Sequence, residues 1–293
     1  MLEYSLIILS TVLFGGQFIA LNFYQNKNGK SYRSIFLFCL LFAFVGAFLF
    51  LCLARFNIHF SWYTFLYASL AAVIQIFLQI VGIKALSLGK VEIYTLFNVA
   101  GGMSVAYLFG ITYFNEPVKV IHIIGLILIL LALVVPIIFD RKNKIKTHWI
   151  FWILCLLVFV SNGFFGSVNK IHIMSGQGLS IYEYMFYVYL MIFIITSICF
   201  ATSFIKYKSE NKELINVKGF IFALLYGLVN STGMFLQYAF ADKVPASILF
   251  PLSNGGCIVF ALIIGSIVYR KIPSLADIIE FVIALGGMVL FIL

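Results

Sequence analysis

Long apolar runs separated by short polar segments divide the chain along its whole length. Each run has about 20 residues, the length at which a helix crosses the ~30 Å hydrocarbon core of a bilayer. In lipid, every backbone polar group must be satisfied within its own segment, which favours helices. The pattern predicts transmembrane helices at approximately 4–25, 33–54, 62–86, 91–113, 119–138, 148–169, 180–204, 218–241, 246–268 and 275–293.

Composition supports an all-α membrane protein rather than a soluble one. Of the 293 residues, 63% are hydrophobic and 10% are charged, whereas soluble domains are about 45–50% apolar and about 25% charged. Such a chain lacks the polar side chains needed to cover a water-exposed surface. We therefore expect an integral, multi-pass membrane protein, and a bacterial plasma membrane as its location.

An internal repeat divides the ten predicted spans into two sets of five. The segment around Gly101 and Gly102 resembles the segment around Gly255 and Gly256: each has an apolar helix with a glycine pair, a short turn with charge and proline, and a second apolar helix. The motif Phe-Leu-Gln occurs at 77–79 and again at 235–237. Five is odd, so the second set enters the membrane from the opposite side. The repeat predicts two inverted five-helix halves, 1–146 and 147–293.

The basic residues predict an orientation. Of the 19 Lys and Arg residues, 15 fall in the odd-numbered loops and 4 in the even-numbered loops. Because cytoplasmic loops collect Lys and Arg, this bias places the odd loops in the cytoplasm and both termini outside. Topology therefore explains the net charge of +9, and we expect no nucleic-acid partner.

Several kinds of chemistry leave no signature in the sequence. The five cysteines lie inside apolar runs without metal-ligand spacing. No segment between spans is long enough for an ATPase domain, and no protease or hydrolase motif occurs. We expect no enzyme activity, no cofactor and no metal site.

The ten spans and their paired glycine helices resemble the drug/metabolite transporter superfamily, EamA type. The turn Asn115-Glu116-Pro117 and its counterpart at 270–273 carry the same resemblance. The family implies a central cavity lined by helices one, three, four, six, eight and nine, and the movement of small organic metabolites, often as efflux. The usual arrangement in this family has both termini in the cytoplasm, whereas the charge count places them outside. We follow the charge count here.

Polar residues inside the predicted spans are candidates for a substrate site, because in lipid they need a partner or a wet cavity. Helix-to-helix hydrogen bonding is the alternative. Several candidates are spaced to share one helix face, and Gln79 and Gln237 are expected to meet near the midplane. The candidates are Gln17, Gln75, Gln79, Tyr94, Asn98, Asn162, Asn230, Gln237, Ser247 and Asn254.

Two carboxylates, Glu183 and Glu280, lie in apolar runs and are candidates for proton coupling. For Lys170, at the end of its span, we expect the side chain to reach the membrane interface. The glycine pairs predict close helix packing, with a broken helix at a binding site as the alternative. Clustered tyrosines such as Tyr187 and Tyr189 predict an interfacial belt or an aromatic-lined cavity.

These observations predict a secondary transporter that moves a small organic metabolite or drug-like solute by alternating access, with efflux as the expected direction. Its partners would be that solute and the lipid bilayer. A membrane-embedded enzyme and a receptor-like structural protein are the alternatives.

Overall fold

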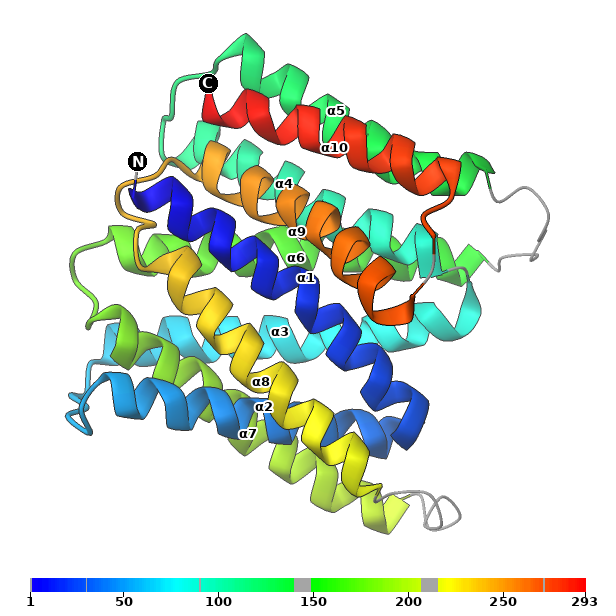
Figure 1. Cartoon of the computed structure of the whole chain (residues 1–293). Helices are drawn as coiled ribbons and strands as arrows, with labels where there is room; N and C mark the ends of the chain where they lie inside the picture. Colours follow the sequence, from blue (N-terminus) through cyan, green and yellow to red (C-terminus); the bar gives the residue numbers. More distant parts are fainter. Residues whose placement is uncertain (1, 30, 90, 140–148, 207–215, 271) are drawn as a thin grey trace.

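The computed structural model describes residues 2–29, 31–89, 91–139, 149–206, 216–270 and 272–293 (Figure 1). Across these residues the chain forms ten α-helices and no strand, and each helix contains a segment long and apolar enough to cross a membrane. The helices are α1 (Leu2–Asn28), α2 (Tyr32–Leu53), α3 (Trp62–Leu88), α4 (Val91–Tyr113), α5 (Val120–Phe139), α6 (Trp149–Met174), α7 (Ile181–Lys206), α8 (Val217–Tyr238), α9 (Ala246–Tyr269) and α10 (Leu275–Ile292).

The predicted spans are confirmed as helices, with small differences at their ends. The largest is at α6, which runs to Met174 instead of 169. Helix ends follow the capping residues: the Ser31 and Ser61 side chains accept from backbone N–H groups in the first turns of α2 and α3. Ser274 and Asp277 form a capping box at α10. These side chains satisfy donors that a helix start leaves without intrahelical partners.

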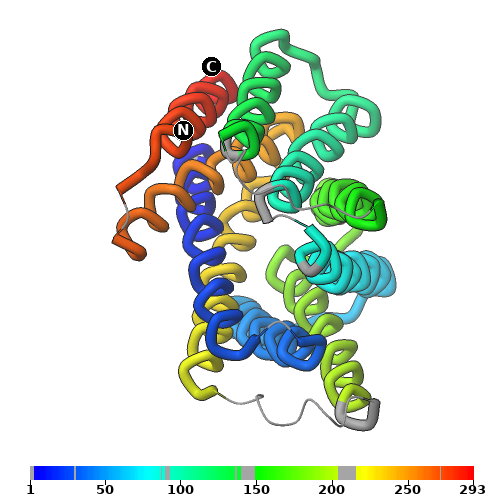
Figure 2. Tube along the Cα trace, turned by 90° about the vertical axis from the view of Figure 1, so that its right-hand side faces the viewer, coloured from blue at the N-terminus to red at the C-terminus, as the bar shows by residue number. Residues whose placement is uncertain are grey.

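The helices form two walls joined at both edges. In Figure 1, α1, α8 and α9 lie in front, and α3, α4 and α6 lie behind them. Helix α1 packs on α8 and α9, and α6 packs on α3 and α4, while α4 and α9 join the walls. The pairs α2–α7 and α5–α10 close the two edges, as the end-on view in Figure 2 also shows.

Both chain ends lie at one end of this bundle (Figure 1). We call that end, with the loops after α2, α4, α6 and α8, the termini end, and the other the far end. Large apolar side chains are exposed on every helix; Phe48, Ile127 and Ile267, for example, are 50% exposed or more. An apolar exterior of this kind fits a lipid environment.

The glycine pairs serve close packing, as the sequence predicted. A Cβ at Gly101 would overlap the backbone carbonyl of Phe159, and one at Gly256 would touch Thr11 and Met288. Helices α4 and α9 run unbroken through these glycines and through Pro251. The alternative of a broken helix is therefore wrong for both pairs.

Candidate functional site

A chain of hydrogen bonds crosses between three helices in the middle of the bundle. The Asn230 side-chain amide on α8 donates to Gln17 Oε1 on α1 at 2.7 Å, and Tyr189 on α7 donates its hydroxyl to Asn230 Oδ1 at 2.8 Å. Asn230 is 6% exposed and Tyr189 is 3% exposed. The chain joins two residues predicted from the sequence with a tyrosine that sequence reasoning assigned to a cluster but not to this site.

Gln75 of α3 lies beside this chain. It lines a cavity of about 10 Å³, which holds no more than one water molecule. None of the residues that line the cavity is charged; they are Phe42, Gln75, Phe165, Met185, Val188, Tyr189, Ile192, Asn230 and Met234. The cavity thus combines neutral hydrogen-bonding groups with aromatic and aliphatic walls, and in this structure it is too small to hold an organic solute.

A second polar group surrounds Gly102 on α4. Asn162 on α6 donates to the Asn98 backbone carbonyl at 2.7 Å. A Cβ at Gly102 would lie within 3.1 Å of both the Asn162 and Asn254 side chains, so the glycine makes room for these amides from α6 and α9. The buried Asn98 Oδ1 accepts no hydrogen bond from the described residues. Three predicted residues are therefore together, with one acceptor free.

The expected meeting of Gln79 and Gln237 is not supported by their positions. Gln237 is the penultimate residue of α8 and lies at the termini end, whereas Gln79 lies roughly 25 Å along α3 from that end, at 1.5 Å per residue. Matching motifs in helices of opposite direction lie at equal depths from opposite surfaces, so they meet only when both are near the midplane. Tyr94 also stands apart, in the contact between α4 and α3 at Gly82.

A buried ion pair at the termini end was missed by sequence reasoning. The Lys170 ammonium on α6 lies 3.4 Å from Glu116 Oε1, and it donates to the Val244 carbonyl at 2.7 Å. The Lys170 side chain is 1% exposed, so the expectation that it reaches the interface is wrong. The available signal was a lysine near the end of one apolar span together with a glutamate in the turn after another, between α4 and α5.

The Glu116 carboxylate also caps α9. It accepts from the backbone N–H of Ala246 at 2.6 Å and of Ser247 at 2.8 Å. Burial acts to raise the pKa of Glu116, but these two N–H donors and Lys170 outweigh it and hold the pKa below its usual value. Ser247, a predicted substrate ligand, therefore lies at the start of α9 with its backbone N–H bonded to Glu116.

Two further side-chain networks connect the helices at the termini end. Asn169 accepts from the Tyr184 hydroxyl at 2.6 Å and donates to the Tyr238 hydroxyl at 3.3 Å, joining α6, α7 and α8. His172 contacts the Thr64 hydroxyl at 3.0 Å and stacks on Tyr184 with ring centroids 3.9 Å apart. The contact between His172 and Thr64 fastens α3 to α6 in the second half of the chain, whereas the Asn169 contacts lie within the second half.

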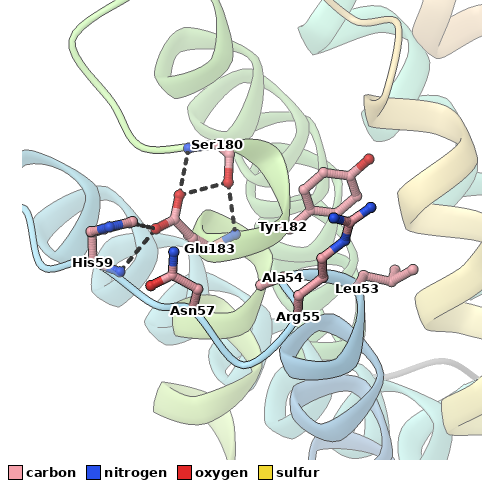
Figure 3. Close-up of a pocket in the computed structure, with 8 residues that line it drawn as sticks. All are labelled: Leu53, Ala54, Arg55, Asn57, His59, Ser180, Tyr182 and Glu183. Carbon is pink, nitrogen blue, oxygen red and sulfur yellow. Dashed lines mark hydrogen bonds and ion pairs between the residues drawn. The ribbon is translucent and has the colours of Figure 1, made fainter.

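Glu183 has a local structural role at the same end (Figure 3). Its carboxylate accepts from the Ser180 hydroxyl at 2.6 Å and from the His59 backbone N–H at 2.9 Å. The first contact belongs to a capping arrangement at the start of α7, and the second ties the α2–α3 loop to it. A surface pocket of about 230 Å³ is lined by Glu183, Ser180 and His59, with Arg55 and Tyr182 on its other side.

Glu280, the other coupling candidate, is a buried residue of α10, 7% exposed. Proton coupling by Glu183 or Glu280 stays a prediction. Glu183 already has several hydrogen-bond donors around it, so between the two Glu280 is the better candidate. For Glu92, another carboxylate near a span, the side chain lies outside the described residues.

Comparisons with known proteins identify the fold alone. No family model matches the sequence, and no curated protein matches it by sequence. Among solved structures, 28 chains match. One, described as "Crystal structure of protein", superposes with a TM-score of 0.77 at 13% sequence identity, covering 98% of this chain and 95% of the other. The ten-helix arrangement is therefore one that solved proteins share.

Proposed function

We propose that this protein is a secondary transporter that moves a small organic solute across a bacterial plasma membrane by alternating access, as the drug/metabolite transporters do. Efflux is the proposed direction, with both termini outside. The observation that carries the proposal is the hydrogen-bond chain from Gln17 through Asn230 to Tyr189, buried in mid-bundle with Gln75 beside it. Buried polar groups at membrane depth are costly, and by default they are candidates for a substrate path.

The packing of the helices supports two related halves. If each helix of the first half is exchanged with its counterpart five places along, the principal pairs map onto one another: α1–α8 onto α6–α3, and α1–α9 onto α6–α4. The pairs α2–α7, α4–α9 and α5–α10 map onto themselves. This is the relation expected of inverted repeats at 1–146 and 147–293, between which transporters bind their solutes.

The chemistry of the site favours an uncharged or zwitterionic solute with an apolar body. The groups around the cavity are amides, a phenol, and aromatic and aliphatic side chains. A full charge on the solute would meet no opposite charge among these lining residues, and its desolvation would stay uncompensated. The free Asn98 Oδ1 is a buried acceptor that a solute N–H or O–H could satisfy.

Solute binding to the purified protein tests the proposal. A thermal-shift screen of neutral and zwitterionic metabolites should find a stabilising solute. Because Asn230 bonds to both Gln17 and Tyr189, we expect Asn230→Ala to weaken the affinity at least tenfold, or about 1.4 kcal/mol. Asn22→Ala, at an exposed position of α1, is the matched control and should bind as the parent does. Equal affinities for Asn230→Ala and the parent would place the solute elsewhere.

A further inference from the structure

The turn that carries Glu116 is fastened to the second half of the chain at three points. It lies between α4 and α5, and its carboxylate contacts Lys170 on α6 and the first two residues of α9. Each of these contacts joins the two halves, and all lie at the termini end. Any separation of the halves at that end must therefore break them.

This set of contacts covers the polar groups in mid-bundle. Lys170 follows Asn162 on α6 by eight residues, roughly 12 Å at 1.5 Å per residue. Helix α9 begins at the termini end, so Ser247 lies about two turns nearer to that end than Asn254 does. The ion pair thus lies between the amide groups around Gly102 and the termini end of the membrane.

The ion pair is stable either when its two charges are in contact in a closed bundle or when both are hydrated in an open one. An intermediate arrangement is unfavourable. With Lys170 1% exposed, parting the charges inside the closed bundle would leave an ammonium buried without its counter-charge, at a cost of several kcal/mol. Parting them while water enters removes that penalty, because both groups become hydrated. The pair therefore favours a fully closed or a fully open end, as expected of a bistable contact.

We propose that Glu116 and Lys170, together with the start of α9, form the gate that closes the termini end of the solute path. The inference rests on the proposed transport function. In the closed arrangement Glu116 neutralises Lys170 and caps α9. In the open arrangement the α4–α5 turn moves away from α6 and α9, and the path from the amide groups to the termini end becomes wet.

Distances across this end test the gate without any solute. Spin labels would be placed at Val118→Cys, on the Glu116 turn, and at Gln177→Cys, in the loop after α6; both positions are exposed. The five native cysteines would be replaced first. Double electron–electron resonance in nanodiscs should give a mainly short distance for the parent. Glu116→Gln and Lys170→Met should each raise the ratio of open to closed molecules tenfold or more.

A matched control removes a carboxylate that caps a different helix. Asp277→Asn acts on the capping box of α10, at the far end, and should leave the distances at the parent values. Unchanged distances in folded Glu116→Gln and Lys170→Met would overturn the gate, and so would an equal shift in the control. If neither variant folds, the pair is a structural support and the proposal also fails.

The outcome also separates the gate from the transport activity. Wider distances in a protein that moves no solute would keep the gate and reject the function. Solute movement with unchanged distances would support the transport function and reject the gate.

Discussion

At the scale of single residues, Glu116 shows how much one carboxylate can hold together in this fold. Its two oxygens accept from two consecutive backbone N–H groups of α9, and one of them also faces Lys170. The start of a helix favours a negative charge, and hydrogen bonds to a charged acceptor are stronger than neutral ones. The side chain is 10% exposed, so water competes weakly for these donors.

The lowered pKa of Glu116 predicts how stability responds to acid. Its usual value is 4.5, and a folded-state pKa below that value means that ionised Glu116 stabilises the fold at every pH above about 4.5. The contribution is lost as the pH falls through the folded-state pKa. We expect Glu116→Gln to lower the unfolding free energy by ~1.5 kcal/mol or more at pH 7.

The difference between parent and Glu116→Gln should then shrink below pH 4.5, because the protonated parent loses the same interactions. Thermal unfolding in detergent from pH 3 to 8 measures this. A difference that stays constant across the whole range would contradict the assigned ionisation of Glu116.

Residue types could be predicted from the sequence better than residue partners. Polar side chains in apolar spans are visible in the sequence, and Gln17, Asn98, Asn162, Asn230 and Asn254 do lie in two mid-bundle groups. Their partners were not visible, because Asn230 meets Tyr189 from another helix and Lys170 meets Glu116 across the two halves. Such pairs depend on how the helices pack against one another, which the spacing of residues within one helix does not determine.

At the scale of helices, length and apolarity determined the prediction almost completely. A helix that spans a bilayer must satisfy its own backbone, so an apolar run of sufficient length has one stable form. Depth within the membrane was harder to predict. The shared Phe-Leu-Gln motif suggested that Gln79 and Gln237 meet, yet α3 continues roughly two and a half turns beyond Gln79, while α8 ends at the residue after Gln237.

Close approach of α4 and α6 gives a prediction at this scale. At Gly101 a Cβ would overlap the Phe159 backbone, which cannot move aside as the end of a side chain could. We expect Gly101→Ala to lower the unfolding free energy by about 1–3 kcal/mol through overpacking. Gly286→Ala is the control, because a Cβ at Gly286 would meet nothing within 4 Å.

Equilibrium unfolding in mixed micelles compares the two alanine variants with the parent. Gly286→Ala should be neutral or slightly stabilising, since alanine favours a helix more than glycine does. If Gly101→Ala proved as stable as Gly286→Ala, the α4–α6 contact would be looser than the structure indicates.

At the scale of the whole molecule, the two walls and their shared edges explain how a bundle of this kind could work as a transporter. The neutral amide groups lie between the walls in mid-bundle, and the cavity beside Asn230 has room for about one water molecule. A solute can therefore enter only if the halves separate at one end. The contacts of Glu116 and His172 hold the two halves together at the termini end in this arrangement.

Solute exchange across a sealed bilayer tests the central claim most directly. Proteoliposomes containing the parent protein would be loaded with a mixture of neutral and zwitterionic metabolites, and the solutes that leave would be identified by mass spectrometry. We expect at least one solute to cross faster than in protein-free vesicles, and Asn230→Ala to slow it at least tenfold, while Asn22→Ala does not. Folded parent protein that moves none of these solutes, or an Asn230→Ala variant that moves them at the parent rate, would contradict the account.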